Sequence, residues 1–119
     1  MNTPIRIKVT EAVGSDICVS SEDGGKVFEK LNMAIQTERP IELDFSGAQI
    51  VISAFLNAAI GRLVENRSKE AILDRIEFTH LGEEDRELIR RVLENAERFY
   101  ADPGQYRRAL EIDEEDDEK

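Results

Sequence analysis

The stretch IELDFSGAQIVISAFLNAAIGRLVEN, residues 41–66, contains the two patterns that decide the fold. Residues 41–45 alternate between apolar and acidic side chains, as in a strand with one buried face. From Ile52 to Val64 the chain is apolar almost all round, which predicts a largely buried helix. The polar residues 46–49 between them are typical of a turn. A strand followed directly by a helix indicates an α/β protein.

Further elements are predicted on both sides of this stretch. Residues 5–10 alternate as a strand, and residues 16–20 form a second, short one, so that a turn at Gly14 would join the two in a hairpin. Apolar residues recur at helical spacing between residues 21 and 39. Residues 72–80 are predicted to be another strand.

The clearest helix pattern covers residues 83–100, with one apolar stripe and three acids in the first turn, where the helix dipole favours them. One more short helix is predicted from Asp102 to Leu110. We therefore expect a small single α/β domain, residues 1–110. It should have a mixed sheet of about four strands with helices packed mainly on one face.

Charge separates the last residues from this domain. The chain of 119 residues carries a net charge of −10, of which residues 111–119 contribute −6. A run of like charges is usually solvated, so residues 111–119 are predicted to be an acidic disordered tail. No basic patch for nucleic acid and no membrane span or signal peptide is found, which favours a cytoplasmic protein.

No motif indicates an enzyme, a cofactor or a metal. The segment DGGKV lacks the glycine and hydroxyl spacing of a phosphate-binding loop, and no nucleophile elbow is present. The single cysteine, Cys18, is expected to be buried in a strand. The single histidine, His80, follows a predicted strand, and without a second histidine or a cysteine near it a catalytic or metal role is disfavoured.

The joint between residues 45 and 53 is the candidate site. Ser53 lies where the helix should begin and would serve as its N-cap. Ser53, Asn57 and Gly61 share one helix face at intervals of four residues, and neighbouring alanines make that face small. Such a face permits close approach of a partner, and burial within the domain would account for it equally well.

The same residues resemble a known family. The stretch is similar to the central motif of STAS domains, the fold of bacterial anti-sigma factor antagonists, and more so to the STAS-like domain of unknown function, DUF4325. The resemblance covers about residues 20–100. It rests on Leu43, Asp44, Phe45, Gly47, Ile52, Ser53, Phe55, Leu56, Gly61 and Leu63. It implies a regulatory domain in bacterial signalling that performs no catalysis and whose partner is a histidine-kinase-like ATPase.

The chain departs from the antagonist motif at the regulatory serine. Antagonist domains carry D-S-S-G or D-S-x-G at this joint, and the second serine is phosphorylated. Here Ile52, Ser53, Ala54 and Phe55 stand at those four positions, so the second hydroxyl is missing. Phosphorylation of Ser53 is therefore not expected to be the main control.

Two hypotheses follow for the joint. The first is a protein-binding surface made by Ser46, Gly47, Ser53, Asn57, Gly61 and Arg62. The second is a small-ligand or enzymatic site, in which Asp44, Ser46 and Ser53 surround an anion or nucleotide. The first is preferred because the resemblance implies a protein partner. The sequence indicates neither the oligomeric state nor the pathway.

Overall fold

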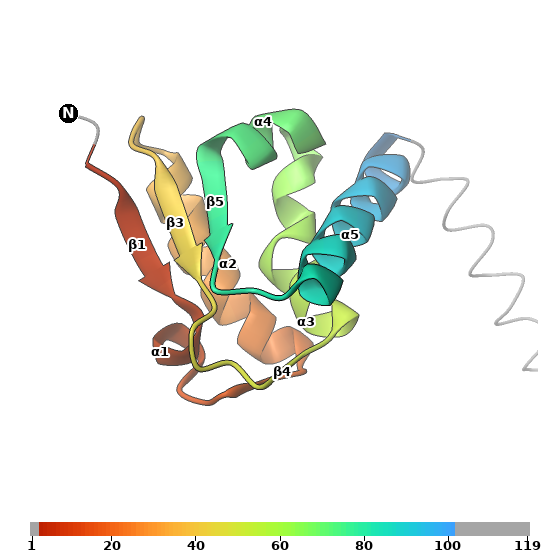
Figure 1. Ribbon diagram of the computed structural model, residues 1–119. Coiled ribbons are helices and arrows are strands. Elements are labelled where there is room, and N and C mark those ends of the chain that lie inside the picture. Colours follow the sequence, from red (N-terminus) through yellow and green to blue (C-terminus); the bar gives the residue numbers. More distant parts are fainter. Residues whose placement is uncertain (1–2, 102–119) are drawn as a thin grey trace, which may run out of the picture.

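The computed structural model of the chain describes residues 3–101 and shows strands and helices in alternation (Figure 1). The elements in chain order are β1 (Ile5–Lys8), α1 (Val9–Val13), β2 (Ile17–Cys18), α2 (Ser21–Ile35), β3 (Ile41–Asp44), β4 (Ile50–Val51), α3 (Ser53–Ala59), the 3-10 helix η1 (Gly61–Glu65), α4 (Lys69–Arg75), β5 (Ile76–Thr79) and α5 (Glu83–Ala101).

The strands form two separate parallel sheets. The larger sheet has the order β1-β3-β5, and the smaller one pairs β2 with β4. Ile5, Ile41 and Ile76 lie opposite one another in the larger sheet, and its three strands run in register from there. All these pairings are parallel, where a mixed sheet of about four strands was expected.

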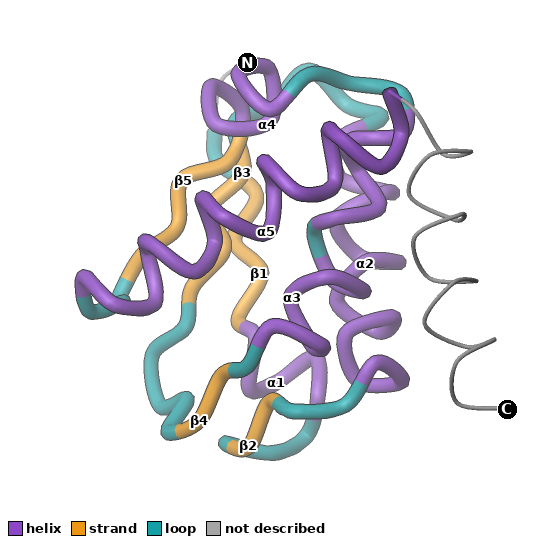
Figure 2. Tube along the Cα trace, turned by 90° about the vertical axis from the view of Figure 1, so that its right-hand side faces the viewer, coloured by secondary structure: helices purple, strands orange, loops and turns teal. Residues whose placement is uncertain are grey.

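The helices lie mainly on one face of the larger sheet, as expected for this small α/β domain. Figure 2 shows the sheet on one side and α2 and α3 on the other, with α5 crossing in front of them. Alternate residues of each strand point toward these helices and are apolar. They are Ile5, Ile7, Ile41, Leu43, Ile76 and Phe78, of which Ile5 is partly buried and the rest are buried. The core therefore lies on one side of the sheet only.

The two central helices approach each other closely. A methyl group on Gly24 of α2 would lie 2.4 Å from the carbonyl oxygen of Phe55 and 2.8 Å from Cβ of Ala58, both on α3. Neither atom can move without its helix. The small residues of α3 therefore serve, in part, to let α2 pack against it. The N-cap of α2 is Ser20, whose hydroxyl accepts a hydrogen bond from the Asp23 amide at 3.0 Å.

Three predicted elements differ from the structure. The hairpin of the first two strands is wrong, because the chain enters α1 directly after Lys8 and β1 pairs with β3 instead. The first part of the predicted strand over residues 72–80 is helix α4, and only residues 76–79 are a strand. The predicted helix from Ile52 to Val64 is divided near Ile60 into α3 and η1.

Other expectations are confirmed or lie outside the described residues. The helix predicted over residues 83–100 is α5, and Cys18 is fully buried. The helix expected from Asp102 to Leu110 and the acidic tail lie outside residues 3–101. Within those residues, no helix combines the length and the apolar character needed to cross a bilayer.

Candidate functional site

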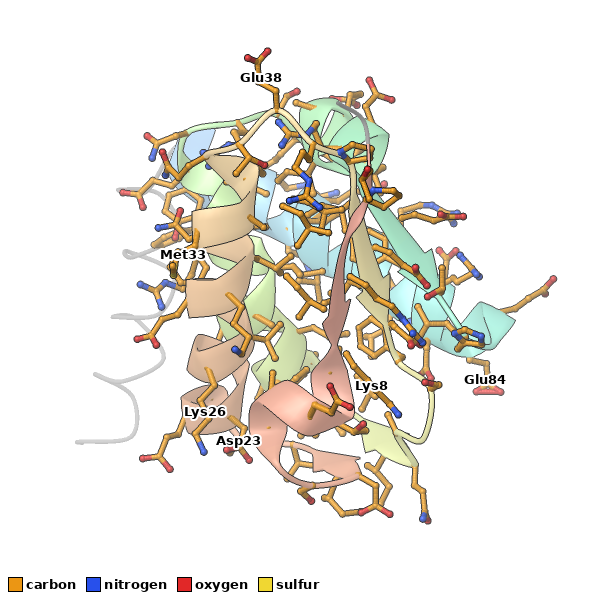
Figure 3. The ribbon with its side chains drawn as sticks, turned by 90° about the vertical axis from the view of Figure 1, so that its left-hand side faces the viewer. Lys8, Asp23, Lys26, Met33, Glu38 and Glu84 are labelled. Carbon is orange, nitrogen blue, oxygen red and sulfur yellow. The ribbon has the colours of Figure 1, made fainter. Side chains whose placement is uncertain are left out.

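The second face of the larger sheet is polar and is not covered by helices. Figure 3, seen from the β1 side, shows polar side chains projecting from the sheet on the side opposite α2. The register places them in two rows across the three strands. These rows are Arg6, Glu42 and Glu77, followed by Lys8, Asp44 and Thr79. We call these six residues the polar face.

Asp44 is the only buried polar residue among those that the structure describes. One carboxylate oxygen, Oδ1, accepts hydrogen bonds from the Ser46 amide at 2.9 Å and from Nδ1 of His80 at 2.7 Å. The other oxygen, Oδ2, accepts from the Ser46 hydroxyl at 3.1 Å and from the Arg6 guanidinium. A buried carboxylate needs this full set of donors, because it has lost its water.

The charge of Asp44 is fixed by these donors. Burial alone would raise the pKa of the Asp44 carboxyl. The Ser46 amide outweighs that effect together with Arg6, the Ser46 hydroxyl and His80, so the pKa lies well below its usual range. Because the carboxylate is ionised, it has no hydrogen to donate. Nδ1 of His80 must therefore carry the hydrogen in the bond between them.

His80 lies directly after β5 in an unusual backbone conformation. Its φ is 60°, and it is the only residue other than glycine with a positive φ within residues 3–101. This left-handed conformation is uncommon for a residue with a side chain. It turns the chain from β5 toward α5 while the imidazole reaches Asp44. The side chain remains 57% exposed, so only one edge of the ring is engaged by Asp44.

Glu42 completes a group of metal-ligating side chains on this face. It accepts a hydrogen bond from the Thr79 hydroxyl at 2.8 Å. One ligand atom from each of Glu42, Asp44 and His80 lies within 4.8 Å of the other two. The alternation of residues 41–45 placed Glu42 and Asp44 on one face, but His80 is joined to them only by the parallel pairing of β3 with β5.

The smaller sheet carries an exposed apolar face of its own. Ile17 and Ile50 are paired across β2 and β4, and Val19 and Ile52 come directly after the last residues of these two strands. These four side chains are 36–48% exposed. The residues between them, Cys18 and Val51, point the other way and contact the core. We call Ile17, Val19, Ile50 and Ile52 the apolar ribbon face.

Part of the predicted partner surface borders this face. Ser46 and Gly47 open the loop that leads from β3 to β4, and Gly47 has a φ of 84°, which favours glycine. Ser53 follows Ile52 directly and is exposed. Its predicted role as N-cap is wrong, because Ser53 is the first helical residue and Ile52 holds the cap position without a side-chain bond.

Asn57, Gly61 and Arg62 lie further along, in a groove between α3, η1 and α5 with a volume of about 250 Å³. Asn57 and Arg62 are exposed, and the Arg62 guanidinium lies 4.0 Å from the ring centre of Phe28. Gly61 is buried, and a methyl group there would contact Val92 and Ala96 of α5. Gly61 thus faces α5 at the base of this groove, and its part in a partner surface stays a prediction.

The predicted ligand site is only partly assembled. Asp44 and Ser46 are hydrogen-bonded to each other, but Ser53 takes no part in the bonds around Asp44. His80 and Arg6, together with Ser46, supply the hydrogen-bond donors of the carboxylate. Sequence reasoning missed both Arg6 and His80. The only sequence pattern that pointed to these two residues was the placing of polar side chains on the same side at the ends of three strands.

Comparison with known proteins agrees with the fold. A family model described as the STAS-like domain of unknown function (DUF4325) matches residues 23–86, which is more than half of the chain. No match was found among curated proteins or among solved structures. The matched range begins in α2 and ends in α5, so it includes Asp44, Ser46 and His80 but neither β1 nor β2.

Proposed function

We propose a protein-binding function for this chain, which belongs to the family of STAS-like domains of unknown function (DUF4325). The binding surface is the apolar ribbon face together with the exposed start of α3. The chain acts as a non-enzymatic regulatory module in the cytoplasm of a bacterium. The STAS resemblance suggests a histidine-kinase-like ATPase as the partner.

The observation that carries this proposal is the apolar ribbon face. Six large apolar side chains are exposed within the described residues, and four of them are Ile17, Val19, Ile50 and Ile52. The other two, Met33 and Leu73, belong to α2 and α4. Single exposed apolar residues are ordinary, whereas a contiguous group of them marks an interaction site.

The free energy gained by covering these four side chains suits a reversible contact. Full burial of one such side chain is worth about 1.5–3 kcal/mol. At 36–48% exposure, covering what remains exposed contributes roughly 0.5–1.4 kcal/mol for each side chain. Four of them give a few kcal/mol, to which the polar groups of Ser46, Ser53 and Asn57 add direction.

A small-ligand function is less well supported. The carboxylate of Asp44 already has four hydrogen-bond donors. An anion would also face the negative charges of Glu42 and Glu77 on the same face. The joint therefore favours a protein partner over an anion or nucleotide.

The test uses a matched pair of substitutions. Ile50→Lys places a charge in the apolar ribbon face, and Met33→Lys places the same charge at an exposed apolar site on α2. Each tagged variant is used to capture partners from a bacterial lysate, and the captured ATPase is then titrated with purified protein. Ile50→Lys is expected to lose the partner, whereas Met33→Lys should retain it.

Two further measurements define the surface. Asn57→Arg tests the exposed part of α3 and should weaken the complex while circular dichroism and melting temperature stay nearly unchanged. Sedimentation of the wild type separates a different occupant, a second copy of the chain, from a true partner. Equal capture by Ile50→Lys and Met33→Lys would show that the apolar ribbon face is not the binding surface.

A further inference from the structure

We propose that Glu42, Asp44 and His80 form a binding site for a divalent transition-metal ion on the polar face of the larger sheet. The ligands are one carboxylate oxygen from each acid and Nδ1 of the imidazole. This site lies apart from the apolar ribbon face and does not depend on the proposed partner.

The distances fit one ion after the side chain of Glu42 has moved toward the other two ligands. The three ligand atoms lie within 4.8 Å of one another. Two atoms bound to one zinc ion at about 2.1 Å can be at most about 4.2 Å apart. In a tetrahedral site such atoms are about 3.3 Å apart, so the partly buried side chain of Glu42 has to move by up to about 1.5 Å. Its second oxygen can keep the hydrogen bond from Thr79.

The other pair of ligands is already adjacent. Oδ1 of Asp44 and Nδ1 of His80 are 2.7 Å apart, and in a tetrahedral zinc site such a pair is separated by about 3.3 Å. The ring of His80 is attached to an exposed turn and can retreat by that amount. Arg6 bonds to Oδ2, the other oxygen of Asp44, and so does not have to leave.

The ligand set indicates the class of ion. One imidazole nitrogen and two carboxylate oxygens suit zinc and its first-row neighbours better than magnesium or calcium, which prefer oxygen alone. His80 is 57% exposed, so the remaining coordination positions face solvent and would hold water. Two of the ligands stand on β3 and the third directly follows β5, which gives them a rigid support.

The surrounding charge also favours a cation. Glu77 lies beside Glu42 in the register, and α5 begins with three acids, Glu83, Glu84 and Asp85, shortly after His80. Arg6 and Lys8 of β1 oppose this field with two positive charges. The acids are in excess, so this part of the surface attracts divalent cations and repels anions.

Binding changes the imidazole in a way that can be measured. In the metal-free protein Nδ1 carries the hydrogen that Asp44 accepts. When the ion takes Nδ1, the ring carries its hydrogen on the exposed Nε2 instead. His80 is the only histidine of the chain, so ring signals in a nitrogen-15 spectrum of the full chain come from this residue alone.

The experiment titrates Zn²⁺ into the full chain. We expect one ion at this site, a change of the His80 tautomer from Nδ1–H to Nε2–H, and loss of the bound ion in His80→Asn. Asparagine is chosen because it tolerates the left-handed backbone at this position. The acidic residues 111–119 can also bind cations, and the imidazole signal distinguishes such binding from occupation of this site.

A matched pair of substitutions separates metal ligation by a side chain from the general attraction of a cation to negative charge. Glu42→Gln and Glu77→Gln each remove one negative charge from the same polar face. Glu42→Gln should weaken binding at least about tenfold, the smallest loss usual for residues that support a metal ligand. Glu77→Gln should change it much less. Equal losses, or a His80 tautomer that Zn²⁺ does not alter, would show that the group only ties the strands together.

Discussion

Asp44 carries a full negative charge at a position without exposure to water. Arg6 of β1 donates one of the four hydrogen bonds of Asp44, and Ser46 donates two. The fourth comes from His80, in the turn after β5. Asp44 therefore ties the carboxyl ends of all three strands together. Protonating the carboxylate would weaken each of these contacts, so the fold should depend on pH through this one group.

The direction of that dependence follows from the pKa of Asp44. In the unfolded chain an aspartate has a pKa of about 3.9. In the folded chain the pKa of Asp44 is well below its usual range, so the unfolded state binds the proton first as the pH falls. The stability that Asp44 contributes is complete above about pH 5 and is lost progressively below about pH 4.

Asp44→Asn should therefore be clearly less stable than the wild type near neutral pH, and the gap should narrow in acid. Urea unfolding of both proteins at several pH values measures it. The same change at exposed Asp74 is the control and should alter stability little at any pH. A gap that stays constant from neutral to acidic pH would mean that the charge of Asp44 does not stabilise the fold.

Residue patterns predicted only part of the cluster of Glu42, Asp44 and His80. The alternation of residues 41–45 gave the strand and put Glu42 and Asp44 on the same side. The contact with His80 spans 36 positions in the chain and arises from the parallel register of β3 and β5. No local pattern encodes that register. A lone histidine after a strand therefore gave no reason to expect a buried aspartate beside it.

Among the elements, α2 and α3 form the closest contact. Gly24 lies against the backbone of Phe55, and the helices meet there without an intervening side chain. The next residue, Gly25, belongs to the same helix but has nothing within 4 Å of the place where its Cβ would lie. The two glycines thus differ in surroundings and share the same helix.

This difference predicts opposite effects of one substitution. Gly24→Ala should push the helices apart and cost about 1–3 kcal/mol, as expected for overpacking of a close contact. Gly25→Ala should stabilise the protein by about 0.5–1 kcal/mol, because alanine loses less conformational freedom in a helix. The free energy of unfolding of both variants, measured in urea, tests this prediction. If Gly24→Ala were as stable as Gly25→Ala, the helices would not be in contact at this point.

Prediction at this scale succeeded where a segment has a long, regular pattern. The stripe of α5 and the alternation of β3 gave the right elements. The segment before β5 was misread, because Ile72, Ile76 and Phe78 fit a strand pattern as well as a helix followed by a strand. Ser68, which caps α4 by accepting from the Ala71 amide at 3.1 Å, was the overlooked signal. Strand pairing was missed because it depends on the crossover helices.

Across the whole molecule, charge is distributed unevenly. The chain has a net charge of −10, and residues 111–119 hold more than half of it. Apolar residues are absent after Ile112, so this part of the sequence offers nothing to bury. The sequence therefore predicts that the charge run contributes to solubility and not to the stability of the domain.

Deletion of residues 113–119 tests whether the charge run contributes to the stability of the domain. It takes the net charge from −10 to −5 and removes no large apolar side chain. The melting temperature should change by less than about 2 °C, since surface changes are usually worth within about half a kcal/mol. A full-length variant with the acids of this segment changed to their amides separates the effect of charge from that of chain length. If deletion lowered the melting temperature strongly while the amide variant did not, the segment would pack on the domain through contacts other than charge. A strong drop in both would show that its charges bind the domain directly.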